Sequence, residues 1–477
     1  MNKYLLLVAI LLPILGSLLV IFNKDEHKVH YLSVAITVIT SILVWYLIFN
    51  ITDEKFELIR FSEKLSFAIN FDGFGKFFAG IVSVLYPLTT LYAVEYMEDD
   101  KRPKSFFFFF LIAYGITLGV TMADDFFTLY CFYELLTLST MPLVLHLNDK
   151  KSIRAARTYL YVSIGGASLA FASMVYVLSH PIIERNTLTQ LFYCFGFFGF
   201  GVKAAVFPTH FWLPKASCAP TPVTALLHAV AVVKAGVFAI IRLTYYIYGT
   251  ENIVNSFGQY IPMIFAIFTI FYGSSMALKE PHFKRRMAYS TVANLSYIIF
   301  GALLMSEAGF VAGLLHMAFH AEIKILGFFA VGAVMHNTSR EFLPELDGLG
   351  KKMPITFACY TVVALALTGI PPLSGFVSKA YLLMAGIDSQ TTLGIVGVIV
   401  LIISAILTAI YSLTPVRRAF FPDKNEDLSG LDKIHEVRWQ MLVPMCLIAL
   451  GIVVTGFASG SIIHVIENIY NTLGGWM

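Results

Sequence analysis

Charged residues are scarce in this sequence of 477 residues: Asp, Glu, Lys and Arg together make up 13% of it. An ordinary soluble domain carries roughly a quarter of charged residues. Because 58% of the residues are hydrophobic, the composition excludes a simple water-soluble enzyme. The net charge of +3 is small, so the charge balance indicates no nucleic-acid partner.

Cysteine clusters and nucleotide-binding motifs are missing as well. The cysteines stand alone, with no C-x-x-C pair and no Cys/His group at metal-ligand spacing. No glycine-rich phosphate motif or nucleophile motif follows a strand pattern, and no soluble segment is long enough for a nucleotide domain. We therefore expect no metal, no cofactor and no redox site in this chain. The cysteines are interpreted as small apolar residues inside helices: Cys131, Cys194, Cys218, Cys359 and Cys446.

Long apolar runs are what the sequence contains instead, and runs of about 18 to 25 residues are long enough to cross a bilayer. The first run follows Lys3 and has no small-residue cleavage site after it, so we expect a retained helix. Hydropathy predicts an all-α polytopic membrane protein with fourteen spans. The predicted spans are 4–22, 31–49, 74–94, 106–122, 126–146, 156–178, 190–208, 222–247, 259–278, 291–305, 309–335, 355–383, 393–415 and 440–458.

Basic residues are distributed unevenly around these spans. When the connecting segments alternate between two sides, 22 Lys and Arg fall on one side and seven on the other. Cytoplasmic loops are rich in Lys and Arg, so we expect both termini outside the cytoplasm, in the cytoplasmic (inner) cell membrane. A Lys at mid-helix costs about 2.5 to 3.5 kcal/mol on insertion scales, which makes such residues candidates for function. Basic residues toward the span ends, Lys76, Arg157 and Arg242, are counted with the connecting segments. The remaining four basic residues lie inside the spans: Lys203, Lys234, Lys324 and Lys379.

Prolines interrupt two of the spans. The seventh contains Pro208, and the twelfth contains Pro371 and Pro372. Broken helices at corresponding places in two halves are typical of inverted-repeat transporters. The two breaks are five spans apart, and a unit with an odd number of helices must insert upside down when it is repeated. We therefore predict two inverted five-helix repeats, helices 4–8 and 9–13; the alternative is that the prolines only kink their helices.

The repeats divide the chain into four parts. These are an N-terminal three-helix segment at 1–105, the first repeat at 106–247, the second repeat at 259–415, and residues 416–477, which hold a cytoplasmic loop, the last span and a short outer tail. In the tail, residues 462–473 form either a short amphipathic helix at the outer interface or a frayed end.

An acidic residue in the fifth span predicts a buried ion pair. Glu134 has apolar residues on both sides, and a carboxylate in a membrane needs a cationic partner or a proton. Lys203, on the broken seventh helix, is the predicted partner. The pair is either structural or a switch, in which movement of Glu134 loads or releases a proton on Lys203.

Further titratable groups lie in the eighth and eleventh spans. On one continuous helix His228 and Lys234 would lie about 120° apart around the axis and roughly 9 Å apart along it, so they do not form a chelating pair. They are successive stations, or His228 is a hydrogen-bonded core residue. In the eleventh span His316, His320 and Lys324 recur every four residues and share one helical face. Three titratable groups in line predict a proton relay.

Two more residues complete the set of buried charges. Glu322 is two positions from both His320 and Lys324, so it must face elsewhere, toward a neighbouring helix or subunit. Lys379 follows the break in the twelfth helix and corresponds to Lys203 if the repeats hold. The alternative for Lys379 is that its amine extends to the membrane surface.

These stretches resemble the antiporter-like subunit family that is shared by respiratory complex I, Mrp-type sodium/proton antiporters and energy-converting membrane-bound hydrogenases. The resemblance extends over residues 70–420, with several long matches in the same order. The most specific stretches are FYELLTLS (132–139), GVKAAVFPTHFWLPKA (201–216), APTPVTALLHAVAVVKAG (219–236), residues 316–324 and GIPPLSGFVSK (369–379).

The resemblance implies a mechanism and a set of residues. Members of this family pass protons, or exchange a cation such as Na⁺ for protons, along a hydrated chain of buried groups at mid-membrane. By position, this chain corresponds to Glu134, Lys203, His228, Lys234, His316, His320, Lys324 and Lys379. Lys379 resembles the residue that opens to the outside. Whether His228 or Lys234 is the central station is left open, as is the role of Glu322.

The resemblance also implies partners. These are the lipid bilayer, other membrane subunits that include related antiporter-like subunits, and, in the redox type of complex, a peripheral iron–sulfur or nickel–iron oxidoreductase module. Because few residues follow the last span, the chain resembles the shorter members, such as the D-type subunit of Mrp antiporters. The sequence leaves open which complex it joins, whether Na⁺ moves with H⁺, and in which direction.

Two other functions are compatible with a polytopic membrane protein. A self-sufficient secondary transporter of an organic solute would gather polar and aromatic groups in one pocket at the helix breaks. A non-conducting assembly scaffold would tolerate replacement of the buried lysines. Here the buried ionisable groups are spread over five spans, which favours an ion-translocating subunit of a multisubunit complex.

Overall fold

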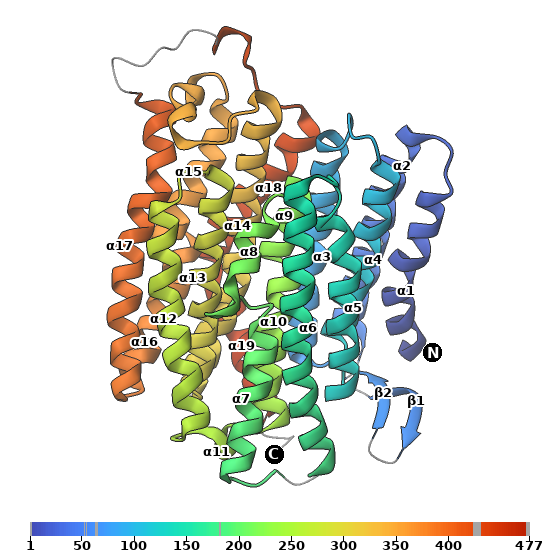
Figure 1. Ribbon diagram of the computed structural model, residues 1–477, viewed down its shortest axis with the longest axis vertical. Helices are drawn as coiled ribbons and strands as arrows, with labels where there is room; N and C mark the ends of the chain where they lie inside the picture. Colours follow the sequence, from blue (N-terminus) through green and yellow to red (C-terminus); the bar gives the residue numbers. More distant parts are fainter. Residues whose placement is uncertain are drawn as a thin grey trace.

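The computed structural model describes residues 2–51, 53, 55–62, 65–180, 183–422 and 431–473. Two residues of the charge count, Lys64 and Lys424, and the last four residues of the tail lie outside this part of the chain. Long helices run side by side along the vertical axis of Figure 1, and both ends of the chain lie in the lower half of that view. The predicted all-α membrane fold is confirmed.

Eleven of the predicted spans are continuous helices. They are α1 (Asn2–Ile21), α2 (Glu26–Asn50), α3 (Gly73–Tyr96), α4 (Pro103–Thr121), α5 (Phe126–Val144), α6 (Lys150–Ser179), α12 (Phe257–Lys279), α13 (Phe283–Leu303), α14 (Glu307–Thr338), α17 (Thr392–Phe420) and α18 (Trp439–Phe457). Within the described ranges, eleven segments are long and apolar enough to cross a membrane, Thr221–Ile247 among them. The tenth span, α13, is not one of these eleven: three basic residues follow its first residue, and polar residues such as Ser290 and Asn294 interrupt its apolar run.

The other three spans are interrupted. The seventh consists of α7 (Thr187–Gly201) and α8 (Trp212–Ala216), and the twelfth of α15 (Pro354–Thr368) and α16 (Ser374–Asp388), so both predicted breaks are confirmed. The eighth consists of α9 (Thr221–Ala229) and α10 (Val232–Arg242), followed by one π-helical turn. This third break, at Val230 and Ala231, was not predicted, because that stretch contains neither proline nor glycine.

Small polar residues at the span edges determine where many helices begin. In each case a side-chain oxygen accepts a hydrogen bond from a backbone N–H of the first turn, which would otherwise lack a partner. These N-cap residues are Asp72, Asp125, Asp149, Asn186, Ser256, Ser306 and Thr391. At the opposite end of α15, Gly369 has a φ of +93° and ends the helix in the left-handed conformation, which glycine adopts without steric cost.

Consecutive helices within each predicted five-helix unit pack on one another. In the first unit α4 packs on α5, α5 on α6 and α6 on α7; in the second α12 packs on α13, α13 on α14, and α14 on both α15 and α16. The units meet where α9 packs on α14, α10 on α13 and α7 on α12. Helix α14 also contacts α3, α18 and α19 (Ser459–Leu473), so it lies near the centre of the bundle. Its buried ionisable groups are therefore surrounded by protein.

Two elements outside the spans lie toward the lower end of Figure 1. An antiparallel hairpin of β1 (Phe56–Ser62) and β2 (Leu65–Ile69) occupies the connection between α2 and α3, and hydropathy gave no sign of it. Helix α19 buries one face, made of Ile463, Ile466, Ile469 and Leu473, and packs on α14 and α3. Of the two alternatives for the C-terminal segment, the amphipathic helix is therefore correct for residues up to 473.

Candidate ion-translocation site

The fold gathers the predicted ionisable residues inside the bundle. They come from α5, α9, α10, α14 and α16 and from the break after α7, and most of them are almost inaccessible to solvent. The buried members are Lys203, His228, Lys234, His316, His320, Lys324 and Lys379, none of which is more than 9% exposed. Glu134 is less enclosed, with a side chain that is 25% exposed.

Lys203 lies directly after α7, in the turn that begins the break. Its Nζ is 3.8 Å from Oε1 of Glu134 on α5, so the predicted pair is in contact range. The amine also donates to the main-chain carbonyl of Tyr133 and lies 3.3 Å from the centre of the Tyr133 ring. Cation–π contacts of this kind stabilise a charged amine away from water. Lys203 is thus held by three different groups of α5.

A glycine brings α10 against the same break. A Cβ placed on Gly236 would lie 2.5 Å from the backbone N of Ala204 and 2.9 Å from the carbonyl carbon of Lys203. No real side chain tolerates such distances to backbone atoms, so only glycine fits here. The main chain two residues after Lys234 therefore packs directly on the main chain of Lys203. This contact joins the first two lysines of the predicted path.

Lys234 makes the link between the two repeats. Its Nζ lies 2.8 Å from Nδ1 of His320 on α14, and both side chains are buried. The Nε2 atom of His320 has no hydrogen-bond partner among the described residues. A neutral imidazole accepts on one nitrogen and donates from the other, so His320 can receive a proton from Lys234 and offer one at Nε2.

His316 continues the path one helical turn away. The rings of His316 and His320 stack with their centres 5.8 Å apart. Nδ1 of His316 is 2.9 Å from Oγ of Ser378 on α16, and its Nε2 is 3.3 Å from Oδ1 of Asn294 on α13. Both ring nitrogens are thus hydrogen-bonded, which fixes the orientation of the ring between two neighbouring helices.

Lys324 shares the face of α14 with the two histidines but bonds to α13. Its Nζ donates to Oγ of Ser290 at 2.6 Å and to the carbonyl of Met287 at 3.2 Å. With Asn294, Ser290 forms a polar stripe on α13 that the sequence interpretation missed. Their spacing of four residues inside an apolar span was a signal that could have identified them.

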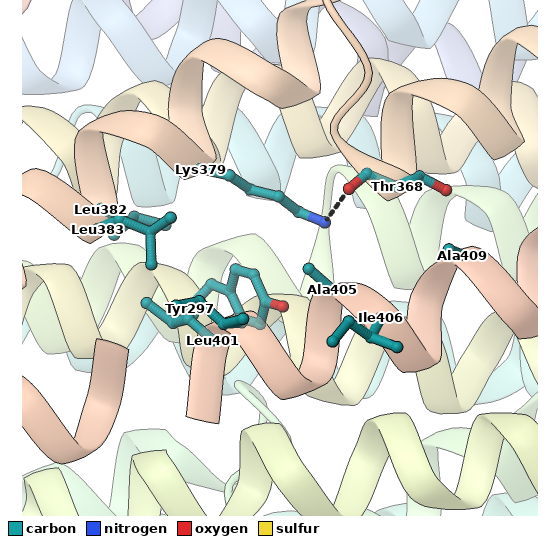
Figure 2. A pocket seen from close by; sticks show the side chains of 10 residues that line it. Tyr297, Thr368, Lys379, Leu382, Leu383, Leu401, Ala405, Ile406 and Ala409 are labelled. Atoms are coloured by element: carbon teal, nitrogen blue, oxygen red, sulfur yellow. Dashed lines mark hydrogen bonds between the residues drawn. The ribbon is translucent and has the colours of Figure 1, made fainter. Parts of the chain in front are cut away.

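Lys379 turns its amine toward the end of the preceding half-helix. Nζ donates to the carbonyl of Leu367. It also donates, at 3.3 Å, to the carbonyl of Thr368, as Figure 2 shows. A cavity of about 300 Å³ lies beside the amine, with Tyr297 and residues of α17 such as Leu401 and Ile406 in its wall. The amine is therefore bound to main-chain carbonyls at the end of α15.

His228 stands apart from these hydrogen bonds. It is fully buried on α9, its ring lies 4.8 Å from that of Phe328, and neither ring nitrogen has a partner within the described ranges. Because the break at Val230 and Ala231 separates α9 from α10, the angle calculated for one continuous helix does not apply to His228 and Lys234. Lys234 reaches α14 through its hydrogen bond to His320, whereas His228 reaches α14 through the ring of Phe328.

Two further charged residues lie inside the helical bundle. Glu322 faces away from the relay, toward α18, where Thr455 donates a hydrogen bond to it at 3.1 Å, so it points to a neighbouring helix. Arg242, counted above with the loop charges, is buried at the end of α10 and binds both carboxylate oxygens of Asp72 at 2.5 and 2.6 Å. Its pairing with Asp72 gives it a structural role.

No cluster of three or more His, Cys, Asp or Glu that could hold a metal ion was found among the residues that the structure describes. The buried residues of this site can transfer protons between amines, imidazoles and a carboxylate. Hydrogen bonds join Lys234 to His320 and His316 to α13 and α16, whereas the two histidines only stack. Continuous transfer along this path therefore requires water between some stations.

Comparison with known proteins places the chain in a family. Residues 123–408 match the family model described as "NADH:quinone oxidoreductase/Mrp antiporter, TM". The chain is 29% identical over 498 residues to the Na⁺/H⁺ antiporter subunit A1 of Staphylococcus aureus. This match covers 96% of the chain and 61% of the relative, so the chain spans less than two thirds of that relative's length.

Solved structures share the fold. A chain of the membrane-bound sulfane sulfur reductase, an archaeal respiratory membrane complex, superposes with a TM-score of 0.86 at 21% identity and 99% coverage of both chains. A chain of respiratory complex I from Thermus thermophilus with bound NADH superposes with a TM-score of 0.84 at 20% identity, also with 99% coverage of both chains. At this level of identity the likeness shows the architecture.

Proposed function

Because this chain belongs to the NADH:quinone oxidoreductase/Mrp antiporter family, we propose that it is a proton-translocating subunit of a multisubunit membrane complex. The observation that carries the proposal is the hydrogen bond of 2.8 Å between Lys234 and His320, two fully enclosed titratable groups from different repeats. Ionisable residues inside a membrane are costly and usually mark an ion pathway. Residues 106–247 and 259–415 are assigned to the two repeats.

The proposed path begins at Glu134 and Lys203. A change in the charge or position of Glu134 alters the proton affinity of Lys203, because an opposite charge a few ångströms away favours the protonated amine. The proton then passes to Lys234 across the Gly236 contact, and from there to His320 and His316. Lys324 lies beside this line and tunes the charge of α14.

Lys379 is the proposed exit. Ser378, its neighbour on α16, is hydrogen-bonded to His316, so the relay reaches the helix that carries Lys379. The cavity beside the amine lies at the place where this exit is proposed. Both termini, and with them the hairpin and α19, are proposed to lie outside the cytoplasm, because the basic loops predict the opposite face to be cytoplasmic.

The complex and its ions follow from the relatives as proposals. One relative is an Na⁺/H⁺ antiporter subunit, and the structural neighbours belong to respiratory complexes. We infer that the chain assembles with other membrane subunits, related antiporter-like chains among them. It moves protons either in exchange for a cation or under the control of a peripheral oxidoreductase module. A transporter of an organic solute is disfavoured, because apolar side chains dominate the lining of the cavity beside Lys379.

The proposal is tested on inverted membrane vesicles from cells with and without this gene, energised in the same way. Proton uptake, read from quenching of an acridine dye, is expected to fall when the gene is deleted and to return with the wild-type gene. Purification of the tagged chain in mild detergent identifies the partners. Unchanged proton and cation fluxes in the deletion strain, with no co-purifying membrane subunit, would contradict the proposal.

A further inference from the structure

The carboxylate of Glu322 has no role in the proposed proton path, yet it lies at the middle of the central helix. Glu322 is on the face of α14 opposite His320 and Lys324, and its partner is the hydroxyl of Thr455 on α18. Among the described residues, no Lys, Arg or His lies within ion-pair distance of it. Lys324 and Lys379 direct their amines elsewhere, to Ser290 and to the end of α15. A carboxylate in a membrane requires a cationic partner or a proton.

The break in the twelfth helix reaches the same part of α18. A Cβ placed on Gly456, the residue after Thr455, would lie 2.2 Å from the carbonyl oxygen of Pro372 and 2.9 Å from the backbone N of Ser374. The non-helical backbone of the break therefore lies directly against α18. Ile323, next to Glu322, lies on the other side of this junction, 3.3 Å from a Cβ placed on Gly375. Helices α14, α16 and α18 thus converge here.

An unpartnered hydroxyl lies at this junction. Ser374 is the first residue of α16, is fully buried, and its Oγ has no hydrogen-bond partner in the described part of the chain. Buried polar atoms without a partner are rare and call for an explanation such as a bound ion. The elements that meet at this junction thus carry a carboxylate, two hydroxyls and a main-chain carbonyl. All four supply oxygen, and only one is charged.

We propose that Glu322, Thr455 and Ser374, with the Pro372 carbonyl, form a binding site for a small monovalent cation of the Na⁺ type beside the twelfth-helix break. Hard cations take oxygen ligands, and the unwound segments of broken membrane helices supply carbonyls to Na⁺ in other transport folds. One negative charge balances one monovalent cation. This site is separate from the lysine and histidine path and goes beyond the proposed function.

The site is tested by chemical protection of Glu322 in native membranes that contain the assembled complex. Dicyclohexylcarbodiimide reacts with protonated carboxyl groups in membranes, and the modified peptide is quantified by mass spectrometry in NaCl and in choline chloride of equal ionic strength. Na⁺ is expected to slow the modification, by about tenfold when its concentration is ten times the Kd. Glu134, in the same digest, is paired with Lys203 and serves as the unprotected control.

Matched variants test the ligands. Thr455→Val removes one oxygen at constant size and should raise the Na⁺ concentration needed for protection, whereas Thr455→Ser should leave it close to the wild-type value. Ser374→Ala provides a second variant if Thr455→Val does not assemble. Equal modification in both salts, or a dependence on pH without any effect of Na⁺, overturns the proposal.

Direct binding gives an independent measurement. In the purified complex, equilibrium binding of ²²Na⁺ is expected to fall by one site per chain in Glu322→Gln, and an unchanged number of sites overturns the proposal. Both measurements read occupancy at Glu322 and not proton flux. If proton transport is absent but Na⁺ still protects Glu322, the cation site is supported and the proton path is not. If proton transport is present but Na⁺ gives no protection, the proton path is supported and the cation site is not.

Discussion

Nζ of Lys234 and Nδ1 of His320 lie 2.8 Å apart although 86 residues separate them in the chain. Lys234 belongs to the first predicted repeat and His320 to the second, so this hydrogen bond crosses the interface between the two units. Neither side chain is more than 1% exposed. The proposed path depends on this bond, because it is the point at which a proton would leave one repeat and enter the other.

Replacement of Lys234 is therefore expected to stop proton transport. In Lys234→Ala, proton uptake by vesicles should fall about tenfold or more, since a lost hydrogen-bonded station raises the barrier by ~1.4 kcal/mol or more. Insertion should not suffer, because removal of a buried Lys makes the span more apolar. Lys215→Ala is the control, since Lys215 is exposed. Wild-type flux in an assembled Lys234→Ala complex would refute the proposed path.

The Glu134–Lys203 pair should act as one unit. Glu134→Gln keeps the shape of the side chain but removes its charge, so proton flux is expected to fall. The double variant with Lys203→Met should be no worse than Lys203→Met alone, because residues in contact do not contribute additively. The fluxes of the four proteins are compared in vesicles with equal amounts of complex. If the loss of proton flux in the double variant equals the product of the two single losses, Glu134 does not act through Lys203.

Ser378 is predicted to orient His316. Loss of one hydrogen bond, worth about 0.5–1.5 kcal/mol, should lower proton flux in Ser378→Ala about two- to tenfold. The effect should vanish in a His316→Ala background, where there is no ring to orient. Ser163→Ala is the matched control, because Ser163 is buried and its hydroxyl has no partner in the described structure. A loss of equal size in the His316→Ala background would assign Ser378 a different role.

The broken seventh and twelfth helices could be predicted because each contains a proline within an apolar run. The break of the eighth helix could not be predicted, since Val230 and Ala231 are ordinary apolar residues. Their conformation depends on tertiary packing around α9 and α10, which local preference does not encode. The hairpin after α2 was missed for a related reason: a search for spans of membrane length passes over strands of five and seven residues.

The candidate site shows the same division. Spacing placed His316, His320 and Lys324 on one face, because helical geometry is periodic. The partners of these residues lie on other helices, and a single sequence does not state which helices touch. Ser378 and Asn294 therefore became visible only in three dimensions. Arg242 was assigned to a loop because it stands near the edge of an apolar run, where hydropathy does not separate a capped helix end from a connection.

Gly236 is predicted to be intolerant of larger residues. In Gly236→Val the new side chain would meet backbone atoms of Lys203 and Ala204, which cannot move aside, and overpacking of this kind typically costs about 1–3 kcal/mol. The unfolding temperature of the detergent-purified protein should fall. Gly165→Val is the control, because nothing lies within 4 Å of a Cβ at Gly165. Equal behaviour of the two variants would contradict the close contact.

The hairpin should be held by a pH-dependent ion pair. Burial opposes the charge of Lys55, but the hydrogen bond to Asp124 and the nearby carboxylates outweigh it and hold the pKa of Lys55 above its ordinary value of 10.5. A raised pKa of a lysine stabilises the fold at pH below 10.5 and loses this effect as the pH rises through the folded-state value.

Lys55→Gln should therefore unfold at a lower temperature than the wild type at pH 8, and the gap should close as the pH rises above 10.5 and through the folded-state pKa of Lys55. The effect is small, about 0.2–1 kcal/mol, because half of the Lys55 side chain is exposed. Thermal unfolding of both proteins across this range provides the measurement. A gap that stays constant with pH would assign the difference to the side chain's packing and not to its charge.

The bare contact at Gly236 has a mechanical consequence. Side chains yield to pressure by changing rotamer, but main chain pressed against main chain transmits a displacement almost undiminished. Under the proposed mechanism, a movement of the α7 break that follows a change at Glu134 would push α10 as a rigid lever. This movement of α10 would then displace the amine of Lys234, whose partner His320 is fixed on α14. A change of charge on one side of the bundle would in this way open or close a gap at its centre through movement of the backbone.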